Sequence, residues 1–493
     1  MNSEEVTLLS HAIATPPNPS AATLRPLCVD LDGTLVKSDT LVDSLLVLAR
    51  NQPAQLLKLP GQLRHGKAAF KAFVTSAVSL DVIHLPYNRA LLPYLQEQAR
   101  LGRAIYLATG ADQRLAHRVA EHLGIFSGVL ASDGTTNLIG KNKLERLRAQ
   151  LGSDKFDYIG NDTPDLPLLK QAPEPMVANP SLRLRLALRA TGLHPTQTFI
   201  EHRGFLHTIL KAMRLHQWAK NLLIFAPLLL AHSLLPAKIL TAVAAFLCYS
   251  LTASSAYLIN DLLDIEADRR HPRKRRRPIA SGDLPGILGA LLAVALLVVA
   301  FAGAHWLPFD FQKWLLVYLV TTLSYSSILK RFALVDVLVL SGLYILRIVA
   351  GAAASGVLIS HWLSGFSMFL FLSLAIVKRF AELENLRAAN TAPKNGRGYL
   401  LADQEQLRAF GTASAYAAVV VYAIYINSTD VIKLYHKPNL LWLTVPLMLL
   451  WLNRVWLLAS RGRLDEDPVA FAITDRASLL IGLCVAAVVL LSL

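Results

Sequence analysis

Long apolar stretches occur only in the second part of this chain, and their distribution limits the folds that it can adopt. Residues 1–205 contain no apolar stretch of about 18 residues, whereas most of residues 206–493 belong to such stretches. With 54% hydrophobic residues and a mean hydropathy of +0.42 over 493 residues, this pattern is typical of a soluble half joined to an integral membrane half. We therefore predict a leader over residues 1–24, a soluble domain over 25–175, a linker over 176–205 and an all-α membrane domain over 206–493.

The membrane half holds nine apolar runs that we interpret as transmembrane helices. The first follows Trp218 and Lys220, which suit the membrane interface, and the others cover residues 237–259, 284–304, 314–329, 335–357, 362–377, 410–426, 440–458 and 477–493. With a cytoplasmic N-terminus, nearly all loop Lys and Arg lie in the even-numbered connections, as the positive-inside rule requires. The first 24 residues lack the charge pattern of a signal peptide. We expect a multi-pass protein of the plasma (inner) membrane whose soluble domain and active sites face the cytoplasm.

The excess of basic residues restricts the class of partner. The net charge is +15, but the Lys and Arg residues gather beside apolar segments. This favours membrane orientation and anionic phosphorylated substrates over nucleic acid. The cysteines Cys28, Cys248 and Cys484 are widely separated and form no metal-binding motif, so the sequence predicts neither a disulfide framework nor a zinc site.

A short apolar strand near the start of the soluble half ends in two carboxylates. Residues 27–29 lead into Asp30 and Asp32, and Gly33 then makes a turn. Two acids at i and i+2 on an extended strand end lie on the same side, so one can attack a substrate while the other handles a proton. The run Asp30-Leu31-Asp32-Gly33-Thr34 resembles the first motif of the haloacid dehalogenase (HAD) superfamily, Asp-x-Asp-x-Thr. The resemblance implies a Rossmannoid α/β domain in which Asp30 is the nucleophile and Asp32 the general acid/base.

Three later segments match the remaining HAD motifs in order. Residues 104–108 form a second apolar strand that ends at Thr109, which by the resemblance binds the phosphate. Lys143, which is better spaced than Lys141, supplies the cation that neutralises phosphate and nucleophile. The last strand, residues 156–160, leads into the fourth motif.

The fourth motif departs from the HAD pattern. Asn161 stands where the family has its first acid, Asp162 follows one place late, and Asp165 takes the second position. The resemblance implies that Asp30, Asp165 and Asp162 hold Mg²⁺. Two interpretations remain open, an active phosphatase and a HAD module that has lost its chemistry and serves for binding or scaffolding.

The residues between the first two motifs are predicted to form a small helical cap. Helical patterns cover residues 41–49 and 67–79 within the span 38–95. By the resemblance such a cap selects the substrate, but no motif in it identifies one.

An acidic stretch followed by a basic one comes directly after the second apolar run. Asn260, Asp261, Asp264 and Asp268 are followed by seven Lys and Arg within the next nine residues. Spacings of three, four and seven place the three carboxylates on one face of a helix. A divalent cation that holds a pyrophosphate satisfies both the acids and the bases, because Mg²⁺ prefers a few carboxylates together with phosphate oxygens and water. The alternative is a solvated loop whose basic residues only fix membrane topology.

Further polar residues lie in or beside the predicted cytoplasmic connections. An intramembrane charge such as Asp336 or Arg347 is by default a functional candidate, although the alternative is a structural ion pair between helices. Lys378 and Arg379 are either functional or topology anchors. The other candidates of this group are Tyr325, Ser326, Lys330, Glu382, Arg397, Tyr399 and Asp403.

The acidic motif, Asn-Asp-x-x-Asp-x-x-x-Asp, resembles that of the UbiA superfamily of intramembrane prenyltransferases, and the resemblance covers residues 206–493. In that family the motif binds Mg²⁺ and a prenyl diphosphate, and a second Asp-rich motif follows the sixth span. This sequence lacks the paired aspartates and has Lys378-Arg379-Phe380-Ala381-Glu382-Leu383 in their place. Together with Arg214-x-x-Gln217-Trp218-x-Lys220-Asn221 and Lys274-x-x-Arg277-Pro278, this resembles the branch typified by decaprenyl-phosphate phosphoribosyltransferases.

The resemblance to that branch implies two substrates, phosphoribosyl pyrophosphate and a polyprenyl phosphate. The pyrophosphate on Mg²⁺ would then lie at Asp261, Asp264 and Asp268, while the lipid phosphate attacks C1 of the ribose without a side-chain nucleophile. The groups implied in substrate binding are Lys220, Asn221, Asn260, Lys274, Arg277, Tyr325, Lys330, Arg347, Lys378, Arg379, Glu382, Arg397 and Tyr399.

The HAD resemblance adds a second step, removal of the 5-phosphate from the lipid product. The chain would then make polyprenyl-phosphoryl-ribose, a donor for cell-envelope glycans. Two other functions remain open at this point, prenyl transfer from a prenyl diphosphate to an aromatic acceptor, and lipid transport or scaffolding without catalysis.

Overall fold

The computed structural model describes residues 24–152, 155–201, 204–388, 398–464 and 468–493. The chain forms two compact units. The first contains the chain up to Thr208 together with Leu263–Gly286, and the second contains Ile209–Leu262 and Ile287–Leu493. Leu263–Gly286 is termed the connecting segment here, because it joins two apolar helices in sequence but belongs to the first unit.

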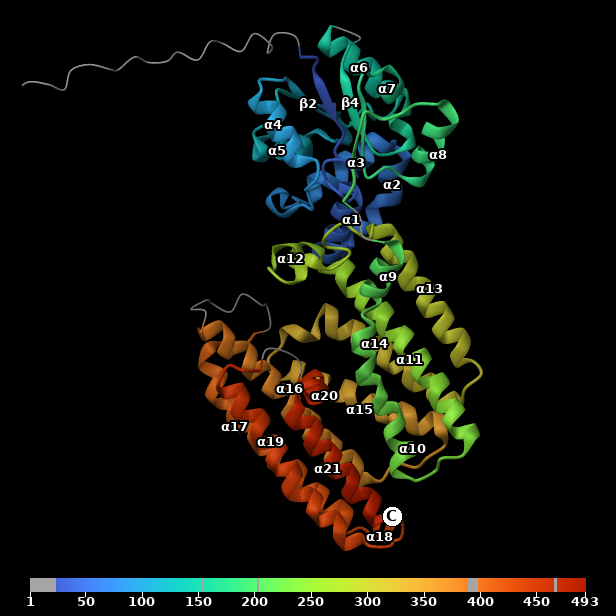
Figure 1. The fold of residues 1–493 in the computed structure, drawn as a ribbon, viewed down its shortest axis with the longest axis vertical. Coiled ribbons are helices and arrows are strands. Elements are labelled where there is room, and N and C mark those ends of the chain that lie inside the picture. Colours follow the sequence, from blue (N-terminus) through green and yellow to red (C-terminus); the bar gives the residue numbers. More distant parts are fainter. Residues whose placement is uncertain (1–23, 153–154, 202–203, 389–397, 465–467) are drawn as a thin grey trace, which may run out of the picture. The chain divides into compact units, whose positions relative to one another are not determined.

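A parallel six-stranded sheet forms the centre of the first unit (Figure 1), as expected for a HAD-like α/β fold. The strands are β1 (Leu27–Val29), β2 (Ile105–Asp112), β3 (Gly128–Ser132), β4 (Asp157–Gly160), β5 (Pro175–Ala178) and β6 (Gln197–Phe199), in the order β3-β2-β1-β4-β5-β6. Cys28 of β1 lies opposite Tyr106 of β2 and Tyr158 of β4. Every residue of β1, β4 and β5 is buried, which is typical of a parallel sheet covered on both faces.

Residues 176–205 are not a linker, so this prediction is wrong. β5 pairs with β4 and β6 pairs with β5, while helix α8 (Leu182–Thr191) lies between β5 and β6 in sequence. Val177 of β5 and both Leu184 and Leu188 of α8 belong to one buried core. The arginines that suggested a linker are part of an amphipathic helix whose buried leucines are one turn apart.

The two predicted cap helices are present. Residues 41–49 and 67–79 correspond to α1 (Thr40–Asn51) and α3 (Lys67–Ala77). Asp39 caps α1, since its Oδ1 accepts hydrogen bonds from the N–H groups of Leu41 and Val42 at 2.9 and 3.1 Å. The other helices that begin in this unit are α2 (Leu59–Arg64), α4 (Leu92–Arg100), α5 (Gln113–Leu123), α6 (Lys141–Leu151), α7 (Leu166–Gln171), α9 (Phe205–Met213) and, in the connecting segment, α12 (Ile265–Arg270).

A buried arginine of the connecting segment forms an ion pair with a helix of the first unit. The Arg269 guanidinium lies 2.8 Å from the Asp43 carboxylate of α1, and the two side chains are only 4% and 2% exposed. Arg269 also donates to Ser38 Oγ and to the Ala280 carbonyl oxygen, each at 3.1 Å. Because a buried charge is stable only when it is paired and hydrogen-bonded, this cluster specifies how the segment packs.

The second unit is all-α, as predicted. Its helices are α10 (Ala226–Leu230), α11 (Pro236–Leu263), α13 (Gly286–Ala304), α14 (Phe309–Ser327), α15 (Val335–Ser355), α16 (His361–Ala388), α17 (Gln404–Ile426), α18 (Thr429–Ile432), α19 (Thr444–Ser460), α20 (Pro468–Thr474) and α21 (Arg476–Ser492). Trp456 of α19 packs against Phe380 of α16 with ring centroids 5.7 Å apart, and its indole N–H donates to Ser373 at 3.1 Å. Gly411 of α17 permits this close packing, since a Cβ there would lie 2.2 Å from the Trp456 ring.

Six helices of the described chain are long and apolar enough to cross a membrane, so the predicted number of nine is not confirmed. They cover residues 236–263, 286–304, 335–355, 361–388, 401–426 and 438–460. The first predicted run folds instead as a 3₁₀ segment, Leu215–Phe225, followed by the five-residue α10. α21 is shorter, with 17 residues, and α14 carries polar residues such as Gln312 and Thr322 that lower its hydropathy. The structure therefore supports a multi-pass membrane protein with fewer clear spans than predicted.

We predict that Arg269→Met destabilises the first unit by about 3 kcal/mol, because it leaves the Asp43 carboxylate buried without its partner. Arg270→Met is the matched control. The Arg270 side chain is 55% exposed and forms a surface ion pair with Asp81, so its loss should cost less than about 1 kcal/mol.

Thermal unfolding of the purified chain in detergent measures this difference. Labelling of the buried Cys28 thiol, in a chain whose other two cysteines are replaced by serine, reports on the first unit. Equal unfolding temperatures for the two variants would contradict the anchoring role of Arg269.

Candidate functional site

The two acids predicted to be catalytic in the soluble half lie at the carboxyl end of β1. The strand order reverses between β1 and β4, and open α/β sheets bind ligands at such a switch point. Asp30 and Asp32 both line a cavity of about 430 Å³. The Thr40 N–H donates to Asp32 Oδ1 at 2.8 Å and holds this carboxylate at the start of α1.

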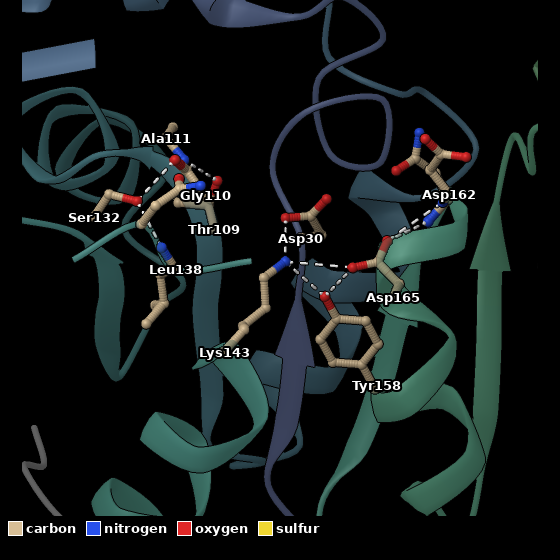
Figure 2. A network of polar contacts seen from close by, with 12 residues as sticks. Asp30, Thr109, Gly110, Ala111, Ser132, Leu138, Lys143, Tyr158, Asp162 and Asp165 are labelled. Carbon is tan, nitrogen blue, oxygen red and sulfur yellow. Dashed lines mark hydrogen bonds and ion pairs between the residues drawn. The ribbon is translucent and has the colours of Figure 1, made fainter. Parts of the chain in front are cut away.

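Lys143 lies at the centre of the polar network in this cavity (Figure 2). Its ammonium donates to Asp30 Oδ1 and to the Tyr158 hydroxyl, each at 2.9 Å, and to Asp165 Oδ1 at 3.4 Å. The Tyr158 hydroxyl donates to the same oxygen of Asp165 at 2.8 Å. The structure thus brings the predicted cation and nucleophile together, whereas Lys141, the other lysine considered, is exposed.

Burial changes the protonation of these groups. It raises the pKa of Asp30 to about 6, although the Lys143 ammonium acts in the opposite direction. It also raises the pKa of Asp32 to about 7, and the Asp39 carboxylate adds to this effect. Burial acts to lower the pKa of Lys143, but the carboxylates of Asp30 and Asp165 outweigh it and raise that pKa. The cavity therefore combines a permanent cation with a carboxylic acid able to hold a proton near neutral pH.

The two acids of the fourth motif, Asp165 and Asp162, form hydrogen bonds with neighbouring protein groups. Asp165 Oδ2 accepts hydrogen bonds from the N–H groups of Asn161 and Asp162 at 3.1 and 3.3 Å. Asp162 Oδ1 accepts a hydrogen bond from the Ser181 hydroxyl at 2.6 Å. Both acids line the cavity, but these contacts show that they also shape the loop after β4.

Thr109, predicted to bind phosphate, is fully buried in β2 and does not line the cavity. Its Oγ1 accepts the Ala111 N–H at 3.0 Å (Figure 2). Gly110, Ala111 and Asp112 line the cavity. The backbone of residues 110–112 at the end of β2 is therefore better placed for a phosphate than the Thr109 hydroxyl. Sequence reasoning also missed Tyr158, and the available signal was a hydroxyl inside a short, fully buried strand.

The donor atoms of the cavity fit the predicted Mg²⁺ in part. In the described part of the chain, no three His, Cys, Asp or Glu side chains gather closely enough to hold a metal ion. Mg²⁺ nevertheless needs only one or two carboxylates when phosphate and water complete its shell. The cavity offers Asp30, Asp32 and the amide of Asn161, and Asn161 lies against Gly33, where a Cβ would be 2.0 Å from the amide nitrogen. Asp30 and the Asn161 amide therefore suit Mg²⁺ in part, and the roles predicted for Asp165 and Asp162 as its ligands stay predictions.

The acidic motif after the second apolar run does not form the single helical face predicted from its spacing. α11 ends at Leu263 and α12 begins at Ile265. Asp264, between them, has backbone angles (φ −96°, ψ 17°) that lie outside the helical range. This interruption ends the periodicity that would align the carboxylates.

Each aspartate of the motif has an arginine partner. The pairs are Arg214 with Asp261 in the second unit, and Arg50 with Asp264 (3.2 Å) and Arg277 with Asp268 (2.6 Å) in the first. Carboxylate oxygens suit Mg²⁺ and guanidinium groups suit phosphate oxygens. Residue chemistry alone is therefore compatible with a metal-bound pyrophosphate, but the described residues hold no cluster of three acids, so the Mg²⁺ site of this motif stays a prediction.

A buried arginine joins three helices of the second unit. Arg379 of α16 donates from Nε to Asp336 of α15 at 2.5 Å and from its Nη atoms to Glu382 at 2.7 Å and to the Tyr325 hydroxyl of α14 at 3.0 Å. The Tyr399 hydroxyl donates to the other oxygen of Asp336. Four predicted site residues, from α14, α16 and a loop, thus join Asp336 of α15 in one network.

Asp336 and Arg347 do not pair with each other. Eleven residues separate them on α15, which is about 16 Å along the helix axis. Arg347 instead donates to Asn221 Oδ1 at 2.9 Å and to the Leu343 carbonyl oxygen. Three tyrosine rings, those of Tyr249, Tyr318 and Tyr344, surround its guanidinium with centroids 5.2–5.5 Å away.

The remaining predicted residues are distributed over both units. Lys220, Asn260, Lys330 and Lys378 lie in the second unit, and Lys274 lies in the connecting segment of the first. Arg397 lies outside the described residues.

Known proteins resemble both parts of the chain. The UbiA prenyltransferase family matches residues 222–488. The uncharacterized protein y4nM of Sinorhizobium fredii is 36% identical over 468 residues, which cover 94% of this chain and 90% of that protein. The decaprenyl-phosphate phosphoribosyltransferase of Mycobacterium tuberculosis is 37% identical over 228 residues, which cover 45% of this chain and 74% of that protein. The solved structure of a UbiA homolog from Archaeoglobus fulgidus bound to GPP and Mg²⁺ matches 57% of this chain and 99% of its own, with 18% identity and a TM-score of 0.45.

We predict that Asp336→Asn destabilises the second unit by about 3–5 kcal/mol, because it leaves the buried Arg379 without its main counter-charge. Glu382→Gln is the control at the same arginine. The Glu382 side chain is 33% exposed, so water can replace it and the cost should be about 1 kcal/mol or less. Thermal labelling of Cys248, as the only remaining cysteine, measures both effects, and a larger effect of Glu382→Gln would contradict this assignment.

Proposed function

The chain belongs to the UbiA prenyltransferase family, and we propose that it transfers 5-phosphoribose from phosphoribosyl pyrophosphate to a polyprenyl phosphate, after which its first unit removes the 5-phosphate. The similarity to decaprenyl-phosphate phosphoribosyltransferase supports the choice of donor and lipid. The y4nM protein matches nearly the whole chain, which fits a joint role for the two halves.

The observation that carries the proposal is the environment of Arg347. Its buried guanidinium meets an amide, a carbonyl and three aromatic rings, and no carboxylate among the described residues forms an ion pair with it. A buried cation with only neutral partners is costly and is stabilised when an anion binds. A lipid phosphate supplies such an anion, because the guanidinium fork matches two phosphate oxygens.

In the proposed transfer, an oxygen of the lipid phosphate attacks C1 of the ribose, and the bond from C1 to the pyrophosphate oxygen breaks. Arg347 orients the attacking phosphate, while Lys274 and Arg277 neutralise the departing pyrophosphate. Mg²⁺, held by the motif Asp261, Asp264 and Asp268, would supply further positive charge for the leaving group. No side chain forms a covalent intermediate.

In the proposed second step, Asp30 attacks the phosphorus of the 5-phosphate, and the bond from phosphorus to the ribose oxygen breaks. Asp32 gives its proton to that oxygen and later accepts a proton from the water that hydrolyses the aspartyl-phosphate, so that inorganic phosphate is released. Burial, which raises the pKa of Asp32 to about 7, allows it to carry this proton. Lys143 balances the phosphoryl charge. Asp30 and Asn161 would hold Mg²⁺, which would neutralise phosphoryl oxygens.

We predict that Arg347→Met lowers Mg²⁺-dependent transfer of labelled 5-phosphoribose to decaprenyl phosphate by about 100-fold or more, because it removes the buried charge proposed to bind the lipid phosphate. Arg331→Met removes an exposed arginine of the same unit and should leave the rate close to that of the unaltered chain. Counting of label in extracted lipid measures both rates.

Arg347→Lys keeps the charge without the planar fork and should recover part of the activity if folding is intact. Labelling of Cys248 checks folding for each variant. Full activity of Arg347→Met, or the absence of labelled lipid with the unaltered chain and Mg²⁺, would refute the proposed transfer.

We predict that Asp30→Asn leaves transfer unchanged but stops phosphate release, because it removes the nucleophile. Mass spectrometry of the lipid product should then find one more phosphoryl group than with the unaltered chain. Asp133→Asn changes an exposed carboxylate of the same unit and should give the dephosphorylated product. If the unaltered chain leaves the 5-phosphate in place, the first unit is a binding module and the second step is wrong.

A further inference from the structure

Three lysines line the cavity of the first unit, and their partners decide which of them can bind an added anion. The cavity lies wholly within this unit, and Lys37, Lys71 and Lys143 line it together with Asp30 and Asp32. A cation that carboxylates already neutralise gains little from another anion. One with neutral partners gains a charge-assisted hydrogen bond.

Two of the three lysines are neutralised. Lys143 lies between Asp30 and Asp165, at 2.9 and 3.4 Å. Lys37 lies 2.6 Å from Asp283 of the connecting segment and 3.6 Å from Glu201. Each of these ammonium groups faces two carboxylates, so neither has unbalanced positive charge.

Lys71 differs from both. It lies on the cap helix α3 and donates to the Gly110 carbonyl oxygen at 2.6 Å and to the Asn137 amide oxygen at 3.0 Å. No carboxylate in the described part of the chain lies within ion-pair distance of it. Burial lowers the pKa of its ammonium, and the more distant carboxylates of Asp32 and Asp39 oppose this shift. An ammonium has three N–H donors, so one remains for a ligand.

The surroundings of Lys71 fit a second anionic group of the substrate. Thr75 lies one turn further along α3 and also lines the cavity, which places a hydroxyl on the same face of the helix. Lys143, which lies beside the proposed nucleophile, belongs to a different element, α6. The cavity therefore has one cation for the reacting phosphate and another, on the cap, for a group that does not react.

We propose that Lys71 and Thr75 form a second phosphate subsite, so that the cavity takes a sugar that carries two phosphate groups. One phosphate, a monoester, lies at Asp30, and the other, a monoester or a diester, lies at Lys71. This rests on the proposed function, because the expected phosphoribosyl lipid carries a 5-phosphate and a phosphodiester at C1. A soluble sugar bisphosphate presents the same chemistry.

Calorimetric binding to the purified full chain tests the subsite without turnover, in an Asp30→Asn background. The probes are ribose 5-phosphate, with one phosphate, and ribose 1,5-bisphosphate, with two. We expect the bisphosphate to bind at least about ten-fold more tightly, and Lys71→Met to remove that difference while the affinity for ribose 5-phosphate is kept. Lys67→Met, an exposed lysine of the same helix that does not line the cavity, should retain the difference.

Steady-state kinetics of the chain that retains Asp30 distinguishes failure of the subsite proposal from failure of the phosphatase proposal. Lys71→Met should raise KM for the bisphosphate at unchanged kcat and leave the hydrolysis of p-nitrophenyl phosphate as it was. If bisphosphate binding depends on Lys71 but no phosphate is released, the subsite is supported and the phosphatase proposal is wrong. An equal loss of affinity for both probes, or no preference for the bisphosphate before mutation, overturns the subsite. Phosphoribosyl lipid in micelles is a third probe, to be compared with ribose 1,5-bisphosphate. The probe whose affinity falls more in Lys71→Met is identified as the ligand.

Discussion

A charged side chain that is buried away from water is stable only when other groups of the protein pair with it or hydrogen-bond to it. This constraint applies to both units of the chain. In the first unit the Lys143 ammonium joins Asp30 after β1, Tyr158 on β4 and Asp165 in the loop after β4. A shift of any of these elements would leave a buried charge or hydroxyl without its partner. The interactions that order this edge of the sheet are therefore the same ones that place a nucleophile beside a cation.

The second unit follows the same rule and has one exception. Arg379 is balanced by Asp336 and Glu382, so its network is complete within the protein. Arg347 is also buried, but its partners among the described residues are neutral groups. This contrast is the physical basis for assigning Arg347 to a substrate phosphate and Arg379 to the arrangement of helices. Lys71 and Lys143 form a comparable contrast in the first unit.

The connecting segment links the two proposed reactions through one stretch of chain. It carries Asp264 and Asp268 of the acidic motif, and its Asp283 lines the cavity that contains Asp30. Arg269 holds the segment in the first unit through Asp43. A product of the first proposed reaction would be released at high effective concentration near a second site on the same polypeptide. This gives a physical reason for joining the two activities in one chain.

Local patterns determined much of this protein. Six of the nine predicted apolar stretches, the strand before Asp30 and the helices of the cap are each encoded within neighbouring residues, so periodicity and spacing were enough to predict them. The predictions that failed concern segments whose tertiary contacts override the local sequence pattern. Residues 176–205 look like a linker but supply β5 and β6, and the spacing of the acidic motif predicts one helical face although the helix is interrupted at Asp264.

Only the tertiary structure decided which charges pair. Lys143 and Asp30 are 113 residues apart in the sequence. Arg269 donates a hydrogen bond to Ser38, which lies 231 residues earlier in the sequence. No periodicity extends over such distances, because the partner of a buried ion depends on which elements pack side by side. The sequence by itself therefore determined the two kinds of domain and most residues able to do chemistry. The fold alone determined which cations are neutralised by carboxylates and which, like Arg347 and Lys71, have neutral hydrogen-bond partners among the described residues.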